Sequence, residues 1–232
     1  MALKFFGQKI FDANLKCVGV ELLVREIPYG LDIVRSPMEI MEHPEFCSKD
    51  MYAIDMQLMT YLHLHESEIK KSQIKYVFIN VSDNLLSRLI LGDDTSFLFR
   101  LLSSLVEALS PVKVVIEVNE LSRIRKEHLE IIVERLKSIG LKIAQDDYTS
   151  HREEYLSIDW DFIKLDLETC KLCEVPKSKQ LVIEKSDNNV LGNLNGSEFH
   201  QGFYFHEPED LSVLFSGESI CSLALVPKAV NQ

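Results

Sequence analysis

Short apolar or β-branched runs recur along the chain, and most of them precede a segment in which apolar positions follow the helical period. This alternation is typical of βα units that build a parallel sheet. Eight such strands are enough to close a barrel. We predict the strands at Lys4–Asp12, Cys17–Arg25, Lys75–Val81, Val112–Val118, Leu141–Asp146, Asp161–Leu165, Leu181–Glu184 and Phe199–Tyr204.

Two connections depart from a regular barrel. Ala13-Asn14-Leu15-Lys16 is too short for a parallel crossover, so the first two strands should form an antiparallel hairpin. The connection from Asp166 to Leu181 is short and contains Pro176, which predicts a shortened late crossover helix. The expected fold class is α/β: a TIM-like (β/α)8 barrel with an antiparallel first strand. Helices are expected at Pro37–Met41, Lys49–Glu66, Thr95–Leu109, Arg123–Ile139 and Pro208–Phe215.

Composition narrows the class of protein. The chain has 232 residues, 46% of them hydrophobic and 26% charged, which is ordinary globular composition, so we expect residues 1–232 to form a single barrel domain. The net charge of −11 disfavours binding to polymeric nucleic acid or to anionic lipid. No secretory signal and no membrane-spanning run is present, which predicts a cytoplasmic location, and the five irregularly spaced cysteines fit reduced thiols.

Polar side chains recur where the predicted strands end, and barrel enzymes place their chemistry at that edge. Each one alone is most simply a solvated loop residue or a partner in a structural ion pair. Together, several carboxylates at one barrel mouth would repel one another unless divalent cations or bound protons offset the charge. The residues are Glu21, Asn80, Glu117, Asp146, Asp147, Lys164 and Glu184.

The donor types limit the chemistry of a cation site. Carboxylate and amide oxygens favour Mg²⁺, Mn²⁺ or Ca²⁺, and a site with two such cations suits hydrolysis of a phosphodiester. Lys164 would then orient or deprotonate the attacking water, or neutralise phosphate charge. The alternative for Lys164 is an ion pair with a neighbouring acid inside the barrel.

The motifs, taken in order, resemble the EAL family of cyclic di-GMP phosphodiesterases. Gln8-Lys9-Ile10 resembles the opening QPI, and Glu21-Leu22-Leu23-Val24-Arg25 resembles EALxR. The other similar segments are Asn80-Val81-Ser82 (NLS), Glu117-Val118-Asn119-Glu120 (ExTE), Asp146-Asp147-Tyr148 (DDF), Ile163-Lys164-Leu165-Asp166 (IKID), Glu184 at the start of EGVE, and Gln201-Gly202-Phe203-Tyr204-Phe205 with Pro208 (QGYxF...P). Their order along nearly the whole chain is more specific than any one motif.

The resemblance implies a role for each matching residue. It makes Lys164 catalytic together with Glu21 and Asp146. It implies that Gln8, Arg25 and Gln201 contact substrate, with Arg25 on the phosphate, and that Glu120 supports a loop. The implied metal ligands are Glu21, Asn80, Glu117, Asp146, Asp147 and Glu184.

The resemblance also implies an activity, cofactors and partners. The reaction is hydrolysis of cyclic di-GMP to the linear dinucleotide, with two Mg²⁺ or Mn²⁺ ions per site, and Ca²⁺ is expected to bind without supporting turnover. Members are cytosolic bacterial proteins that often form dimers, so a homodimer is one expectation for this chain.

Two segments depart from the family pattern. Tyr148-Thr149-Ser150-His151 follows Asp147 where the family has a glycine-containing loop, and non-glycine residues change the backbone path available there. EGVE becomes Glu184-Lys185-Ser186-Asp187. These departures motivate an alternative function, a catalytically inactive EAL-like module that acts as a cyclic di-GMP receptor or a protein-binding regulator. They fall outside the ligand set, so hydrolysis stays the leading prediction. Cys170 and Cys173 have CxxC spacing, but without a second ligand pair they are better interpreted as two thiols than as a zinc site.

Overall fold

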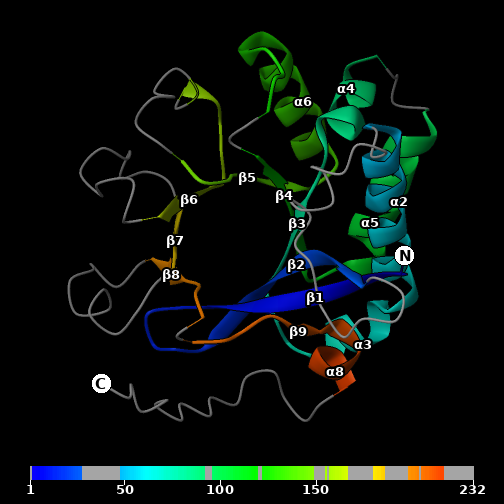
Figure 1. Cartoon of the computed structure of the whole chain (residues 1–232). Coiled ribbons are helices and arrows are strands. Elements are labelled where there is room, and N and C mark those ends of the chain that lie inside the picture. Colours follow the sequence, from blue (N-terminus) through cyan, green and yellow to red (C-terminus); the bar gives the residue numbers. More distant parts are fainter. Residues whose placement is uncertain are drawn as a thin grey trace.

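The structure is a computed structural model that describes residues 2–27, 48–91, 96–119, 122–148, 155, 157–166, 180–185, 198–203 and 205–216. Eight strands form a closed barrel, and helices lie against its outer side (Figure 1). The strands are β1 (Ala2–Phe11), β2 (Cys17–Ile27), β3 (Tyr76–Asn80), β4 (Lys113–Val118), β5 (Lys142–Gln145), β6 (Phe162–Asp166), β7 (Gln180–Glu184) and β8 (Phe199–His200).

The barrel closes through β1, which lies between β2 and β8. β1 is antiparallel to both neighbours, with Gln8 opposite Glu21 and Phe11 opposite His200, whereas the pairs from β2 to β8 are parallel. The predicted (β/α)8 barrel with an antiparallel first strand is therefore confirmed. A short strand that the sequence pattern did not predict, β9 (Glu209–Asp210), pairs with β1 beside β8.

Six helices belong to the described part of the chain, and four of them occupy predicted positions between strands or after β8. These are α2 (Ser48–Leu64), α5 (Phe97–Leu109), α6 (Lys126–Ser138) and α8 (Leu211–Ser216). The pattern missed α3 (Glu66–Lys71), which follows α2, and α4 (Asp83–Leu91). The predicted helix Pro37–Met41 and the shortened crossover after Asp166 lie outside the described residues.

Strand alternation separates two apolar layers. Successive side chains on a strand point to opposite faces, so each barrel strand sends alternate residues outward to the helices and inward to the barrel axis. On β3, Val77 and Ile79 belong to the large cluster shared with the helices, whereas Phe78 belongs to the inner cluster. The inner cluster fills the barrel below its mouth and contains Ile10, Val18, Phe78, Val115, Ala144, Phe162 and Val182.

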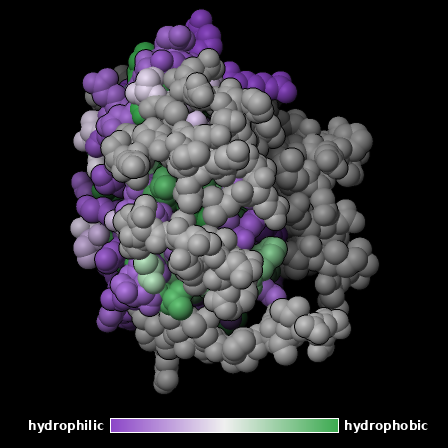
Figure 2. Space-filling model, turned by 90° about the vertical axis from the view of Figure 1, so that its left-hand side faces the viewer, coloured by the Kyte–Doolittle hydropathy of each residue, from purple (hydrophilic) through white to green (hydrophobic). Residues whose placement is uncertain are grey.

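The outer surface of the described residues is mixed in polarity. On the face shown in Figure 2, hydrophilic side chains predominate among these residues, and the apolar ones form small separate patches. None of the helices in the described ranges combines the length and the hydrophobicity that crossing a bilayer requires.

Candidate functional site

On several barrel strands, the next inward-facing position after the inner apolar cluster carries a polar residue. Because side chains alternate, a residue two positions after an inward apolar residue also points into the barrel. Asn80 follows Phe78 in this way, and Glu117 follows Val115. The same spacing places Asp146, Lys164, Glu184 and Gln201 two positions after Ala144, Phe162, Val182 and Phe199. These residues form a polar layer at the carboxyl ends of the strands, where barrel enzymes hold their active sites.

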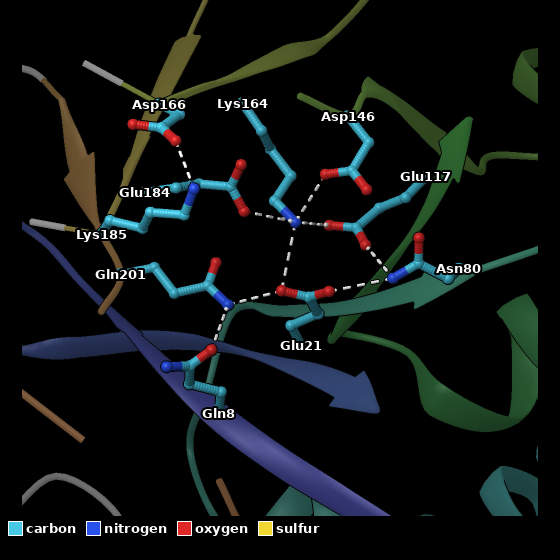
Figure 3. A network of polar contacts seen from close by, with 10 residues as sticks. All are labelled: Gln8, Glu21, Asn80, Glu117, Asp146, Lys164, Asp166, Glu184, Lys185 and Gln201. Carbon is cyan, nitrogen blue, oxygen red and sulfur yellow. Dashed lines mark hydrogen bonds and ion pairs between the residues drawn. The ribbon is translucent and has the colours of Figure 1, made fainter. Parts of the chain in front are cut away.

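The Lys164 ammonium lies at the centre of this layer (Figure 3). Its Nζ atom is 2.8 Å from Asp146 Oδ1, 3.0 Å from Glu184 Oε1, and 3.1 Å from both Glu21 Oε2 and Glu117 Oε1. The Lys164 side chain is only 1% exposed. The ion-pair alternative considered for Lys164 is thus what the structure contains, with four partners from four different strands or strand ends.

Three amides complete the layer. Asn80 donates its side-chain N–H groups to Glu21 Oε1 at 2.9 Å and to Glu117 Oε2 at 2.7 Å. Gln201 donates Nε2 to Gln8 Oε1 at 3.0 Å and to the Glu21 carboxylate. Gln8 in turn donates to the backbone carbonyl of His206, so β1, β2 and the segment after β8 are tied together at the site.

The site has more acidic than basic charge. Four buried carboxylates surround one ammonium, so three negative charges remain when all five groups are ionised. Burial, together with the charge of Glu21, raises the pKa of Glu117 well above its usual range. Burial also raises the pKa of Asp146, and it raises that of Glu184 to about 8. The excess charge is therefore costly unless protons or cations offset it.

Lys164 and Glu21 show the opposite balance, because ion pairing outweighs burial. Burial alone would lower the pKa of Lys164, but Asp146, Glu117 and the other two carboxylates raise it well above its usual range. Burial would raise the pKa of Glu21, but Lys164 and the hydrogen bond from Gln201 lower it. Lys164 is consequently protonated and Glu21 ionised in this arrangement.

Two predicted residues, Arg25 and Asp147, lie apart from the Lys164 network. Arg25 follows Glu21 by four residues on β2 and is half-buried; its Nη1 donates to the carbonyl of Val24. Burial lowers the pKa of Arg25, and the charge of Glu21 opposes that effect. Asp147 is exposed, with φ of 40°. Glu120 lies outside the described residues.

Only the first residue of the altered loop after Asp147 is described. Tyr148 is 1% exposed and belongs to the outer core cluster, and its backbone N–H donates to the Lys164 carbonyl at 3.0 Å. Asp147 adopts positive φ between the inward Asp146 and the buried Tyr148. Residues 149–154 and the Cys170–Cys173 pair lie outside the described residues.

Asp166 and Lys185 form an ion pair that the sequence analysis did not assign to the site. Asp166 lies two residues beyond Lys164 on the same face of β6 and directly opposite Glu184 on β7. Its side chain is 5% exposed, whereas that of Lys185 is 65% exposed. The inward spacing from Lys164 would have identified Asp166. Lys185, with φ of 48°, carried no comparable signal.

Two further carboxylates support the loops at the site. Asp55 of α2 accepts hydrogen bonds from the backbone N–H of Ser82 at 3.2 Å and from its hydroxyl, just after Asn80. Asp83 of α4 accepts from the Ser122 hydroxyl at 2.6 Å and from the Arg123 backbone at 2.8 Å. These contacts tie the loops that follow β3 and β4 to each other and to the helices.

The donor chemistry fits a hard divalent cation, but the present arrangement is closed around Lys164. Glu184 Oε2 is a buried oxygen that accepts no hydrogen bond, whereas Glu117 Oε1 and Asp146 Oδ1 face the Lys164 ammonium. Among the described residues, no three carboxylate, imidazole or thiolate groups are placed to hold a metal ion together. Asn80 presents its amide nitrogen to the carboxylates, so its oxygen would reach a cation only after the amide turned over.

Comparisons with known proteins identify solved structures that have a similar fold. No protein-family model and no curated protein matches the chain, whereas 35 chains of solved structures do. The EAL enzyme Bd1971, in a form with cAMP and cyclic di-GMP bound, is 19% identical; the match covers 92% of this chain and 64% of that one, with a TM-score of 0.67. The YkuI protein of Bacillus subtilis, which has an EAL domain and is in complex with cyclic di-GMP and calcium, is 20% identical; the match covers 90% and 55%, with a TM-score of 0.66.

The EAL-like domain protein YdiV is 9% identical, and the match covers 92% of this chain and 95% of that one, with a TM-score of 0.69. The chain therefore spans less than two thirds of the length of Bd1971 and of YkuI, but nearly all of YdiV. At these identities the likeness concerns the path of the backbone. This chain has the fold of EAL domains.

Proposed function

We propose that this chain hydrolyses cyclic di-GMP to the linear dinucleotide with the help of divalent cations. The observation that carries the proposal is the convergence of Glu21, Glu117, Asp146 and Glu184 around Lys164 at the mouth of an EAL-type barrel. A structural ion pair needs one acid for one lysine. Four acids leave charge that a divalent cation offsets.

The cation site would use the oxygens of the polar layer. We assign Glu21, Asn80, Glu117 and Asp146 as ligands, with Asp147 and Glu184 completing the set. When bound, Mg²⁺ or Mn²⁺, two per site, would activate water and stabilise charge on the displaced oxygen. The larger Ca²⁺, with its looser coordination, is expected to bind without turnover.

The remaining groups act on substrate and water. We assign Lys164, which its four acids hold protonated when no cation is bound, to donate hydrogen bonds to the attacking water or to a phosphate oxygen. Asp146, the carboxylate nearest to the ammonium at 2.8 Å, is the group we assign to take the proton of the water. Gln8 and Gln201 hold Glu21 in place and face the same mouth.

Phosphate charge requires cations outside the carboxylate layer. Arg25 lies four residues along β2 from Glu21 and stays charged at any ordinary pH. Lys185 lies at the edge of the layer, bound to Asp166, with most of its side chain in solvent. We assign both to the phosphates of the substrate, Arg25 by its match to EALxR and Lys185 by its place beside Glu184.

Incubation of the purified chain with cyclic di-GMP and Mg²⁺ or Mn²⁺ tests the proposal. Chromatography should reveal the linear dinucleotide. Glu21→Ala should abolish the product, because it removes a ligand and a partner of Lys164, whereas Glu130→Ala on the exposed face of α6 should leave it unchanged. If the chain forms no more linear product than Glu21→Ala does, the proposed hydrolysis is wrong.

A second function is favoured by the closed geometry around Lys164. With the ammonium in the centre and no three metal-ligating groups arranged together in the described residues, the layer could hold the nucleotide without cleaving it. Calorimetry with cyclic di-GMP distinguishes the cases. Binding without turnover identifies a receptor, and no binding with or without metal points to a regulator that recognises a protein.

The setting of this activity is part of the same proposal. We infer that residues 1–232 act as one EAL-type domain in the cytoplasm, without polymeric nucleic acid or a membrane as partner. A homodimer is the expected assembly by analogy with the fold family. Sedimentation of the purified chain tests that expectation.

A further inference from the structure

A cavity lies at the opposite end of the barrel from the carboxylate layer. It has a volume of about 420 Å³, within the range of about 300–1,000 Å³ for small-molecule pockets. Tyr76 and Lys113, which line it, are the first residues of β3 and β4. Asn80, at the other end of β3, belongs to the candidate site. The two places are therefore separated by the length of the strands.

Three lysines surround this cavity without an acidic partner. Lys70 lies near the end of α3, Lys75 immediately before β3, and Lys113 at the start of β4; all three are exposed. Within the described ranges, none of the three forms an ion pair. Such a concentration of positive charge contrasts with the net charge of −11 for the whole chain. Three adjacent ammonium groups repel one another, and an anion between them would relieve that repulsion.

The floor of the cavity is apolar and its backbone is fixed. Ile74 and Val112 are buried at 3% and 4% exposure, and the half-buried Tyr76 ring packs edge-on against Phe162 at 5.2 Å between centroids. The backbone N–H of Lys113 donates to the Lys75 carbonyl at 2.8 Å, which sets the spacing between these two lysines before any ligand arrives. A preformed apolar floor with a cationic rim suits a ligand that has an apolar part and an anionic part.

We propose that this lysine pocket, formed by Lys70, Lys75, Lys113 and the floor residues Ile74, Tyr76 and Val112, is a second binding site for a phosphorylated small molecule of the mononucleotide class. The lysines bind the phosphate, and the flat base lies against Tyr76 and the aliphatic floor. The site is independent of the hydrolysis proposed above, because none of its residues belongs to the carboxylate layer.

Calorimetric titration of the full chain with guanosine 5′-monophosphate in low-salt buffer tests the pocket. The wild type should bind the nucleotide, and Lys75→Ala/Lys113→Ala should bind it at least about tenfold more weakly, because two charged hydrogen-bond donors are lost. If the double variant does not fold, Lys70→Gln can replace it, because this substitution lies at an exposed helix position and alters no strand. Lys70→Gln should also bind the nucleotide more weakly than the wild type.

Two controls separate the lysine pocket from general charge effects. Lys142→Ala removes a lysine that also begins a barrel strand but that is paired with Asp161 at 2.7 Å, so it should leave the affinity unchanged. Guanosine, which lacks the phosphate, should bind at least about tenfold more weakly than its monophosphate. The proposal is overturned if the monophosphate does not bind, if guanosine binds equally well, or if the lysine variants bind as tightly as the wild type.

Discussion

Lys164 illustrates how one residue can satisfy a structural and a functional requirement at once. Its ammonium contacts Glu21, Glu117, Asp146 and Glu184 while the side chain is almost entirely excluded from solvent. A buried lysine is tolerated only when its charge is paired, and here the acids far exceed what pairing requires. The surplus of acids is therefore the informative feature, and the lysine is the counter-ion that keeps them together.

Replacing Lys164 with methionine should lower stability strongly. The four carboxylates would lose their common partner, and removing one member of a buried ion pair costs about 3–5 kcal/mol. Urea denaturation at pH 8 measures the loss. Lys142→Met should cost no more than about 1 kcal/mol, because the Lys142 side chain is 43% exposed and Asp161 keeps Lys137 as a second partner. Equal effects of the two substitutions would contradict a special role for the buried network.

Lys185 allows a test at the edge of the same site. Lys185→Gln should raise KM for cyclic di-GMP about tenfold and change kcat little, because an exposed cation beside the site contributes to binding the phosphate more than to the reaction step. Lys185→Arg should retain most of the binding. Steady-state kinetics would disprove the assignment if Lys185→Gln left KM unchanged.

At the scale of elements, the regular parts of the fold were predictable and the short ones were not. The run Tyr76-Val77-Phe78-Ile79 alternates inner and outer apolar residues, so its strand could be placed within one residue. The helices α3 and α4 have only six and nine residues, too short for a clear helical period. β9 has two residues and exists only because it pairs with β1.

The candidate site also has features that the sequence predicts and features that it does not. Most of its polar layer was predictable, because six members follow an inward apolar residue by two positions, on a strand or just past its end. Its pairings were not, because Lys164 and Glu21 are 143 positions apart and meet only when the barrel closes. The exposed position of Asp147 was equally inaccessible, because it depends on the path that the backbone takes after Asp146.

The contact between α2 and the loop after β3 should make stability depend on pH. Burial raises the pKa of Asp55 to about 6 from its ordinary value of 3.8, despite the hydrogen bonds from Ser82. An acid whose pKa is higher in the folded state destabilises that state as pH rises, here between about 4 and 6, by up to about 3 kcal/mol. Asp55→Asn should remove this loss, because its side-chain oxygen can still accept both hydrogen bonds from Ser82.

Urea denaturation of the wild type and of Asp55→Asn at pH 4, 5, 6 and 7 measures the effect. The difference in unfolding free energy should move in favour of the asparagine variant as pH rises, and should level off above about pH 6. A difference that stays constant across this range would show that the Asp55 carboxyl titrates alike in the folded and unfolded chain.

For the whole molecule, the two ends of the barrel differ in charge. The mouth gathers carboxylates around one ammonium, and the opposite end carries the lysine pocket, whose three lysines have no acidic partner in the described ranges. The seven parallel strands β2 to β8 produce such a polarity readily, because they all present the same end at the same edge. Divalent cations and anionic small molecules should therefore affect stability through different ends of the molecule.

Divalent cations provide the test at this scale. Under the proposed function Mg²⁺ binds the folded chain through the assembled carboxylates, so it should raise the melting temperature measured against EDTA, with a stabilisation of about 2.7 kcal/mol at a hundredfold excess over Kd. Glu184→Gln should reduce that rise. Its oxygen can keep the contact to Lys164 at 3.0 Å while its amide takes the place of the Oε2 atom that accepts no hydrogen bond.

The same substitution should have the opposite effect when no divalent cation is present. Burial raises the pKa of Glu184 to about 8, so above that pH the folded chain carries a costly charge that glutamine lacks. In EDTA at pH 9, Glu184→Gln should therefore be more stable than the wild type, and in Mg²⁺ the gain should shrink or reverse. Glu134→Gln, on the exposed surface of α6, should respond to neither condition. If Mg²⁺ raised the melting temperatures of all three chains equally, the cation would be acting on the general surface charge and not on the carboxylate layer, because only a site that includes Glu184 can distinguish these variants.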